Sequence, residues 1–127
     1  MSTLDPQELE TVCFQLISGA GVAKSNYMQA IAEARGGNYE QAQALIAEGD
    51  KMQNMAHEPH ANLVQREATG DPVVMTLLMT HAEDQMANSE VFRQMAVELV
   101  EVYKRLNGDA EAAAGAGEGV QAENAAE

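Results

Sequence analysis

Two glycine-containing breaks divide residues 1–107 into three long segments, each with the apolar spacing of an α-helix. The breaks are Gly-Gly-Asn at 36–38 and Thr-Gly-Asp-Pro at 69–72. Within each segment apolar residues recur every three or four positions, as they do along one face of a helix. This spacing runs over Leu9–Ala34, Ala42–Val64 and Val74–Leu106. No stretch has the strict alternation of a β-strand, so the sequence predicts an all-α chain.

Short connections make consecutive helices antiparallel, so we predict a three-helix bundle with long helices. Asp71 before Pro72 is typical of an N-cap followed by proline in the first helical position, which places the start of the third helix there. Pro59 removes one backbone hydrogen bond and should kink the second helix. Gly19 and Gly21 either weaken the first helix or let a neighbouring helix approach closely.

Beyond residue 107 the composition changes to Ala, Gly and Glu. Residues 108–127 contain five acids, no base and one apolar residue larger than alanine, Val120. Such a segment has too little apolar surface to form a core, and we predict that it is disordered. The expected organisation is therefore a helical domain at 1–107 followed by an acidic tail at 108–127.

The overall charge excludes one class of function. The chain carries a net charge of −13, from 20 acids and 7 bases. That field repels nucleic acid and would attract a basic protein partner.

No apolar run approaches the roughly 20 residues that a membrane-spanning helix needs. The N-terminus has no secretory signal pattern and Cys13 is the single cysteine, so we expect a cytoplasmic protein without internal disulfides.

The start of the third segment is apolar almost all round, where an outer helix of a bundle should have a polar back. The residues concerned are Val73, Val74, Met75, Leu77, Leu78 and Met79. This pattern favours self-association along the helix. The alternative is a core helix whose connecting loops shield it.

The sequence contains no glycine-rich phosphate loop, no CxxC, no HExxH and no GxSxG. The candidates for chemistry are histidines. His81 and Asp84 lie three residues apart and therefore share a helix face, where a carboxylate can fix the imidazole tautomer or join it as a metal ligand. The alternative for His81 is a packed, hydrogen-bonded core residue.

The other histidines, His57 and His60, lie three apart on the second helix. Two helical histidines need further ligands to hold zinc, so a metal-binding bundle would require both to converge with His81. The more ordinary interpretation is that His57 and His60 are structural or solvated residues. Cys13 lies in an apolar stripe with no adjacent cation, which is typical of an inert core thiol.

Five fragments, in order along the chain, carry a resemblance to a known family. They are Cys-Phe-Gln-Leu-Ile-Ser-Gly-Ala-Gly-Val-Ala-Lys-Ser at 13–25, Ala-Ile-Ala-Glu-Ala-Arg at 30–35, Asn-Tyr-Glu-Gln-Ala at 38–42, Ala-His at 56–57 and Leu-Leu-Met-Thr-His-Ala-Glu-Asp at 77–84. Together they resemble the lactose/cellobiose-type enzyme IIA of the sugar phosphotransferase system, and the resemblance covers about residues 8–106. The last fragment resembles the His-Ala-Gln-Asp phosphorylation site of that family.

The resemblance implies a homotrimer of three-helix protomers that acts as a phosphotransferase component. His81 would accept a phosphoryl group on Nε2 from the histidine phosphocarrier protein HPr. It would then pass the group to a cysteine of a IIB protein, for uptake of a lactose- or cellobiose-like sugar. Asp84 matches the aspartate at the trimer axis, where three carboxylates need shared protons or a metal ion such as Mg²⁺.

Three residues depart from the family pattern. Glu83 stands where the family has glutamine, which adds a negative charge beside the phosphoryl acceptor. His60 stands in a second glutamine position, and Pro59 precedes it. The alternative function for the chain is a non-catalytic acidic helical scaffold that binds protein partners.

Overall fold

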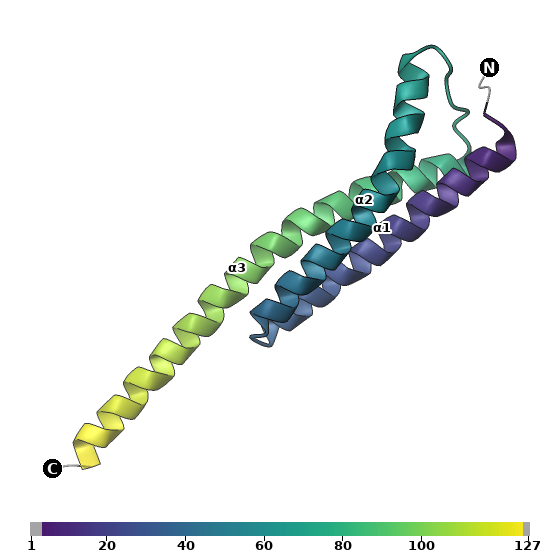
Figure 1. The fold of residues 1–127 in the computed structure, drawn as a ribbon. Coiled ribbons are helices and arrows are strands. Elements are labelled where there is room, and N and C mark those ends of the chain that lie inside the picture. Colours follow the sequence, from purple (N-terminus) through teal and green to yellow (C-terminus); the bar gives the residue numbers. More distant parts are fainter. Residues whose placement is uncertain (1–3, 126–127) are drawn as a thin grey trace.

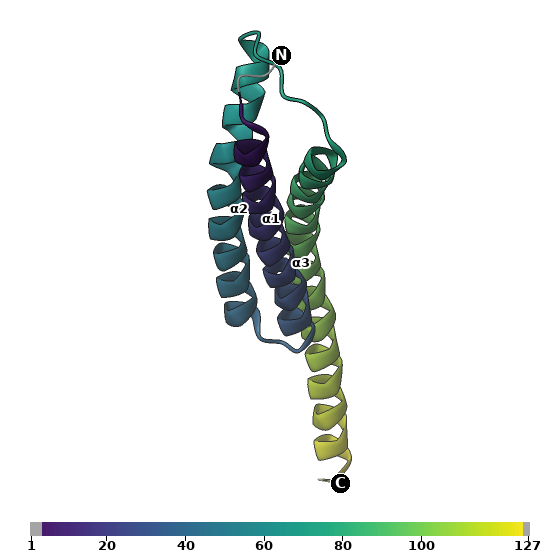
Figure 2. The same ribbon diagram turned by 90° about the vertical axis from the view of Figure 1, so that its right-hand side faces the viewer.

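Three long helices make up nearly all of the part of the chain that the structure describes. The computed structural model describes residues 4–125, except for the side chains of 111–113 and 116–125. The helices are α1 (Pro6–Arg35), α2 (Tyr39–Ala68) and α3 (Leu77–Ala125). They run antiparallel in sequence order, with α1 between α2 and α3 (Figures 1 and 2). The described residues contain no strand, and the predicted antiparallel three-helix bundle is confirmed.

The ends of α1 follow from local sequence. Asp5 and Glu8 form a capping box, and the Asp5 carboxylate also accepts from the backbone N–H of Gln7 at 2.9 Å. α1 ends at the predicted break, where Gly37 has a φ of 84° that other residues rarely adopt. We call this end of the bundle, closed by residues 36–38, the turn end.

The connection between α2 and α3 differs from the sequence prediction. Residues 71–76 are not helical, and Asp71 is not the N-cap of α3. Its carboxylate instead accepts a hydrogen bond from the guanidinium of Arg66, in the last turn of α2. Thr76 caps the start of α3 instead, because its Oγ1 accepts a hydrogen bond from the backbone N–H of Met79 at 3.1 Å. We call this end of the bundle, spanned by residues 69–76, the loop end.

α2 continues through Pro59 but does not stay straight. Figure 1 shows the last part of α2 turning away from the direction of its first part, toward the loop end. Proline inside a helix removes one hydrogen bond and crowds the preceding turn, so the bend has the predicted cause.

Two hydrophobic clusters fill the bundle, one at each end. The loop-end cluster comprises Leu9, Cys13, Leu16, Ala20, Ala56, Leu63, Met79, Ala82 and Met86. The turn-end cluster comprises Ala23, Tyr27, Ala30, Ile31, Ala34, Ala42, Ile46, Ala96 and Val100. Many of these side chains are small, which lets the helix backbones approach closely. A Cβ on Gly19 would lie 2.8 Å from Ala56 Cβ, whereas one on Gly21 would meet nothing within 4 Å.

The structure also differs from the sequence prediction after residue 107. The backbone of residues 108–125 continues α3 as a helix, which projects beyond the turn end (Figure 2). Alanine and glutamate are strong helix formers, and a helix already nucleated in the bundle can extend into such a segment. The division into a domain at 1–107 and a separate tail stays a prediction. Within the described residues, no helix is long and apolar enough to cross a membrane.

Candidate functional site

The loop end presents His81 on the second turn of α3. Met79 and Ala82 of the same turn are buried, with 1% and 0% of their surface exposed, whereas His81 is exposed. The helix therefore directs His81 away from the core. The alternative of a packed core histidine is wrong, because the core-facing positions of this turn are taken by Met79 and Ala82.

Asp84 is also exposed and follows His81 by three residues, so the two lie on one face of α3 as predicted. Residues 77–92 of α3 contain two further acids and no lysine or arginine. The first base on the helix, Arg93, is already bound by Asp50. Residues 77–92, the part of α3 around His81, thus offer it negative charge and no lysine or arginine.

The two polar departures from the family pattern meet across the α2–α3 interface. His60 Nε2 lies 2.8 Å from the Glu83 carboxylate, a distance at which the two groups share a hydrogen bond. His60 comes from α2, one residue after Pro59. Glu83 is therefore directed toward α2, on a different side of α3 from His81. The contact between His60 and Glu83 was not predicted from the sequence.

The remaining candidates do not join His81. His57 is exposed on α2. No group of three or more His, Cys, Asp or Glu in the part of the chain that the structure describes is arranged to hold a metal ion. A zinc site formed by the three histidines is therefore not supported.

Cys13 is a buried core residue, as predicted. It has 1% of its surface exposed, and its Sγ donates to Met79 Sδ at 3.7 Å. Burial is the main cause that raises the pKa of the Cys13 thiol, which keeps it protonated and unreactive.

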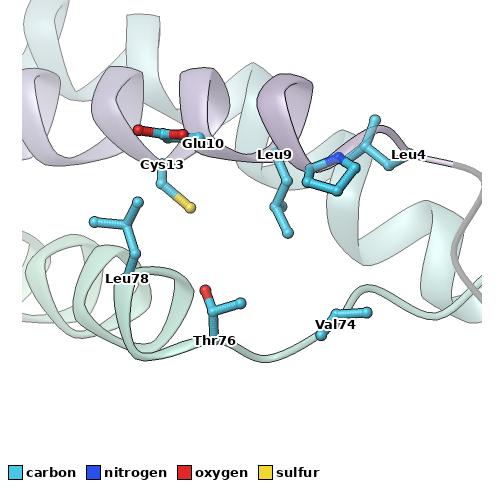
Figure 3. A pocket seen from close by; sticks show the side chains of 8 residues that line it. Leu4, Leu9, Glu10, Cys13, Val74, Thr76 and Leu78 are labelled. Carbon is cyan, nitrogen blue, oxygen red and sulfur yellow. The ribbon is translucent and has the colours of Figure 1, made fainter.

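An apolar groove lies beside the start of α3, between α1 and residues 74–78. It has a volume of about 370 Å³ and is lined by Leu4, Pro6, Leu9, Glu10, Cys13, Val74, Thr76 and Leu78. Figure 3 shows Leu9 and Cys13 of α1 facing Thr76 and Leu78 across it. Near it, Val74, Met75 and Leu77 are 59%, 59% and 87% exposed. The alternative that loops shield this apolar stretch is therefore wrong for these three residues.

A polar network that the sequence did not predict fixes the turn-end half of the bundle. Asp50 of α2 accepts from Tyr27 Oη at 2.7 Å and from Arg93 Nε at 2.6 Å, so it joins all three helices. Burial acts to raise the pKa of Asp50, but the hydrogen bonds from Arg93 and Tyr27 outweigh it and hold that pKa below its usual value. Burial and the Asp50 contact raise the pKa of Tyr27.

Comparison with known proteins identifies the family of this chain. A sequence model of the family described as "PTS system, Lactose/Cellobiose specific IIA subunit" matches residues 11–104. The chain is 36% identical over 100 residues to the lichenan-specific phosphotransferase enzyme IIA component of Bacillus subtilis, a match that covers 79% of this chain and 91% of that protein.

Solved structures agree with this match. The cellobiose-specific enzyme IIA from Bacillus anthracis is similar with a TM-score of 0.76 and 29% identity, over 84% of this chain and 95% of that one. The IIA(chitobiose) structure of Escherichia coli, solved in a complex with HPr, is similar with a TM-score of 0.68 and 28% identity. That match covers 79% of this chain and 97% of that one.

The helical bundle and these matches together place the chain in the class of helical phosphotransferase-system components. Within that class, the chain belongs to the family of lactose/cellobiose-specific IIA subunits of the phosphotransferase system. The resemblance seen in the sequence is thereby confirmed.

Proposed function

We propose that this chain carries phosphoryl groups on Nε2 of His81, from HPr to a cysteine of a IIB protein, in the cytoplasm. The observation that carries the proposal is the exposure of His81 on α3 within the matched region 11–104, beside core-facing neighbours that fix its direction. The sugar is of the lactose or cellobiose type, which the family description supports. The structure of a IIA protein bound to HPr supports HPr as the donor.

The proposed transfer consists of two displacements at phosphorus. The lone pair of His81 Nε2 forms a new P–N bond while the bond between phosphorus and the donor nitrogen of HPr breaks, and the donor imidazole takes up a proton. In the second step a IIB thiolate attacks the same phosphorus, the P–N bond to His81 breaks, and the His81 imidazole leaves and is reprotonated. Both steps require an in-line approach, which an exposed side chain allows.

Positive charge for these steps must come from outside α3. The transferred phosphoryl group carries negative charge on its oxygens, and residues 77–92 supply no cation to balance it. The net charge of −13 favours a basic partner and steers it toward the chain. We therefore expect HPr to contribute the compensating charge when it docks at the loop end.

The same helix supports assembly into a homotrimer. Exposed apolar residues of α3 recur at heptad-related positions, as in a coiled-coil seam, and Asp84 falls in the same strip. The strip comprises Leu77, Asp84, Val91, Met95 and Val102. His81 precedes Met95 by two heptads and therefore lies on the same face of α3 as this strip. Three copies of Asp84 would meet near the axis, where shared protons or Mg²⁺ would offset their repulsion.

A labelling experiment tests the proposed acceptor. The full chain is incubated with phosphorylated HPr, and acid-labile phosphate is mapped by mass spectrometry on the wild type and on His81→Ala. We expect label on His81 of the wild type and none on the variant, with equal helical content by circular dichroism. His57→Ala, another exposed histidine, is the matched control and should be labelled normally. Full labelling of His81→Ala would refute the assignment.

A further inference from the structure

His60 and Glu83, which both stand where the family pattern has glutamine, are hydrogen-bonded to each other. An ionised carboxylate can only accept hydrogen bonds, so His60 Nε2 must carry the hydrogen in the 2.8 Å contact with Glu83. The His60 side chain is 23% exposed and that of Glu83 is 39% exposed. The pair is therefore partly shielded from solvent, and each side chain has a defined partner.

The direction of Glu83 matters because it follows His81 by only two residues. Side chains two positions apart on a helix do not face each other, and Glu83 reaches α2 while His81 points to solvent. A glutamate side chain has several rotatable bonds. If it were released from His60, it would sample other rotamers at the helix surface, including ones that bring its charge nearer to His81.

We propose that His60 is a positioning residue for phosphoryl transfer at His81, because it holds the Glu83 carboxylate against α2 and away from the incoming phosphoryl group. The inference rests on the proposed function of His81. Like charges on a protein surface repel one another over distances up to the Debye length, about 8 Å. With no lysine or arginine at residues 77–92, α3 has nothing to offset a displaced carboxylate.

The His60–Glu83 bond also connects α2 to α3 close to the bend at Pro59. A test therefore has to distinguish the effect of the Glu83 charge from the effect of holding the two helices together. Three variants do so. His60→Leu removes the donor and keeps most of the volume. The double variant His60→Leu/Glu83→Gln removes both the donor and the carboxylate charge. Glu83→Gln alone keeps a side chain that can accept from His60.

The readout is the rate of phosphoryl transfer from phosphorylated HPr to the full chain in a single turnover. We expect His60→Leu to be about three- to tenfold slower than wild type, as for one added like charge near the reacting group. The double variant should return to within about twofold of wild type, and Glu83→Gln should be at least as fast. Raising the salt concentration should narrow the gap between His60→Leu and wild type, since screening weakens a charge effect and not a structural one.

Two results would overturn the inference. If the double variant is as slow as His60→Leu, the bond acts as a structural connection. If His60→Leu is as fast as wild type, Glu83 needs no positioning. Should His60→Leu fail to fold by circular dichroism, His60→Ala gives the same comparison. A wild type that takes no phosphoryl group on His81 would instead refute the proposed function, so the two failures are distinguishable.

Discussion

The two ends of the bundle are built on different principles. At the turn end, Tyr27 is fully buried, bonds Asp50, and rests against Gly49, where an added Cβ would lie 2.5 Å from the ring. At the loop end, eight non-helical residues (69–76) separate α2 from α3, and the side chains of Leu77 and His81 face solvent. The turn end pairs its buried polar groups, Tyr27 and Asp50, within the bundle. The loop end leaves His81 exposed to other molecules.

This difference shows how a small bundle can combine stability with an exposed reactive residue. The interlocking contacts that hold the helices in register lie around Tyr27, far along the chain from His81. The loop end can therefore tolerate a bend at Pro59 and exposed apolar residues. If the division is correct, changes at the turn end should alter stability with little effect on phosphoryl transfer.

Among the single substitutions, the largest effect should come from Gly49→Ala. The new methyl group would overlap the Tyr27 ring, and forcing a group into a packed core costs about 2 kcal/mol, or roughly 8 °C in Tm. Labelling of His81 in the folded protein should not change. Thermal unfolding by circular dichroism and the labelling assay check the two expectations.

Gly21→Ala is the matched control, because a Cβ there meets nothing within 4 Å. Alanine is the better helix former, so this variant should gain up to about 1 kcal/mol. Equal Tm values for Gly49→Ala and Gly21→Ala would contradict the close packing inferred at Tyr27.

At the loop end, Asp84→Leu should strengthen the proposed trimer. Three carboxylates near an axis repel one another, and leucine replaces that repulsion by apolar contact. We expect a rise in Tm of about 5 °C and insensitivity to EDTA, with His81 still phosphorylated. Sedimentation of wild type and variant with and without EDTA measures the assembly. A monomeric wild type, or a variant trimer weaker than wild type, would contradict the placement of Asp84.

A smaller effect should appear as pH dependence at the turn end. The pKa of Asp50 is lower in the folded protein than its ordinary value of 3.8, because Arg93 and Tyr27 donate to the charged form. The stability it adds is therefore present above pH 3.8 and is lost as the pH falls through the lower folded pKa. In Asp50→Asn, Tm should fall less than in the wild type as the pH is lowered from about 5 to about 2. Parallel Tm curves for wild type and variant would show that Asp50 contributes nothing.

The sequence predicted the helices and the turn at 36–38 because both depend on local information. Apolar residues at intervals of three and four define a helix face, and paired glycines interrupt it. His81 and Asp84 were placed on one face for the same reason. The resemblance over 77–84, and not the spacing, singled out His81 from the other histidines.

The features that the sequence did not predict depend on distant partners. Asp71 has the local pattern of an N-cap, but its carboxylate is bound by Arg66, so Thr76 takes that role. Similarly, His60 and Glu83 lie 23 residues apart and pair only once α2 and α3 are in register. The Asp50–Arg93 pair could have been predicted by aligning the second and third predicted helices antiparallel, since each residue lies within one of them.

The smallest effect should follow removal of residues 108–127. The described side chains of 108–110 are exposed, and the segment adds charge and little apolar surface. Asn107, the last residue kept, donates to Ala34 O at 3.3 Å and to Tyr39 Oη at 2.7 Å and so anchors α3 to the turn end. The shortened chain should retain its Tm to within about 2 °C and should label at His81 as before.

A second truncation turns this small effect into a measurement of where the packed part of α3 ends. Removing residues 103–127 also deletes Asn107 and Tyr103, whose ring packs against the turn-end cluster. That chain loses buried surface and leaves Ala34 O without its side-chain donor, so its Tm should fall by more than about 8 °C. Thermal unfolding of both truncated chains beside the full chain gives the comparison. A large loss already on removing 108–127 would show that the last part of α3 contributes to the bundle, and the predicted boundary at 107 would be wrong.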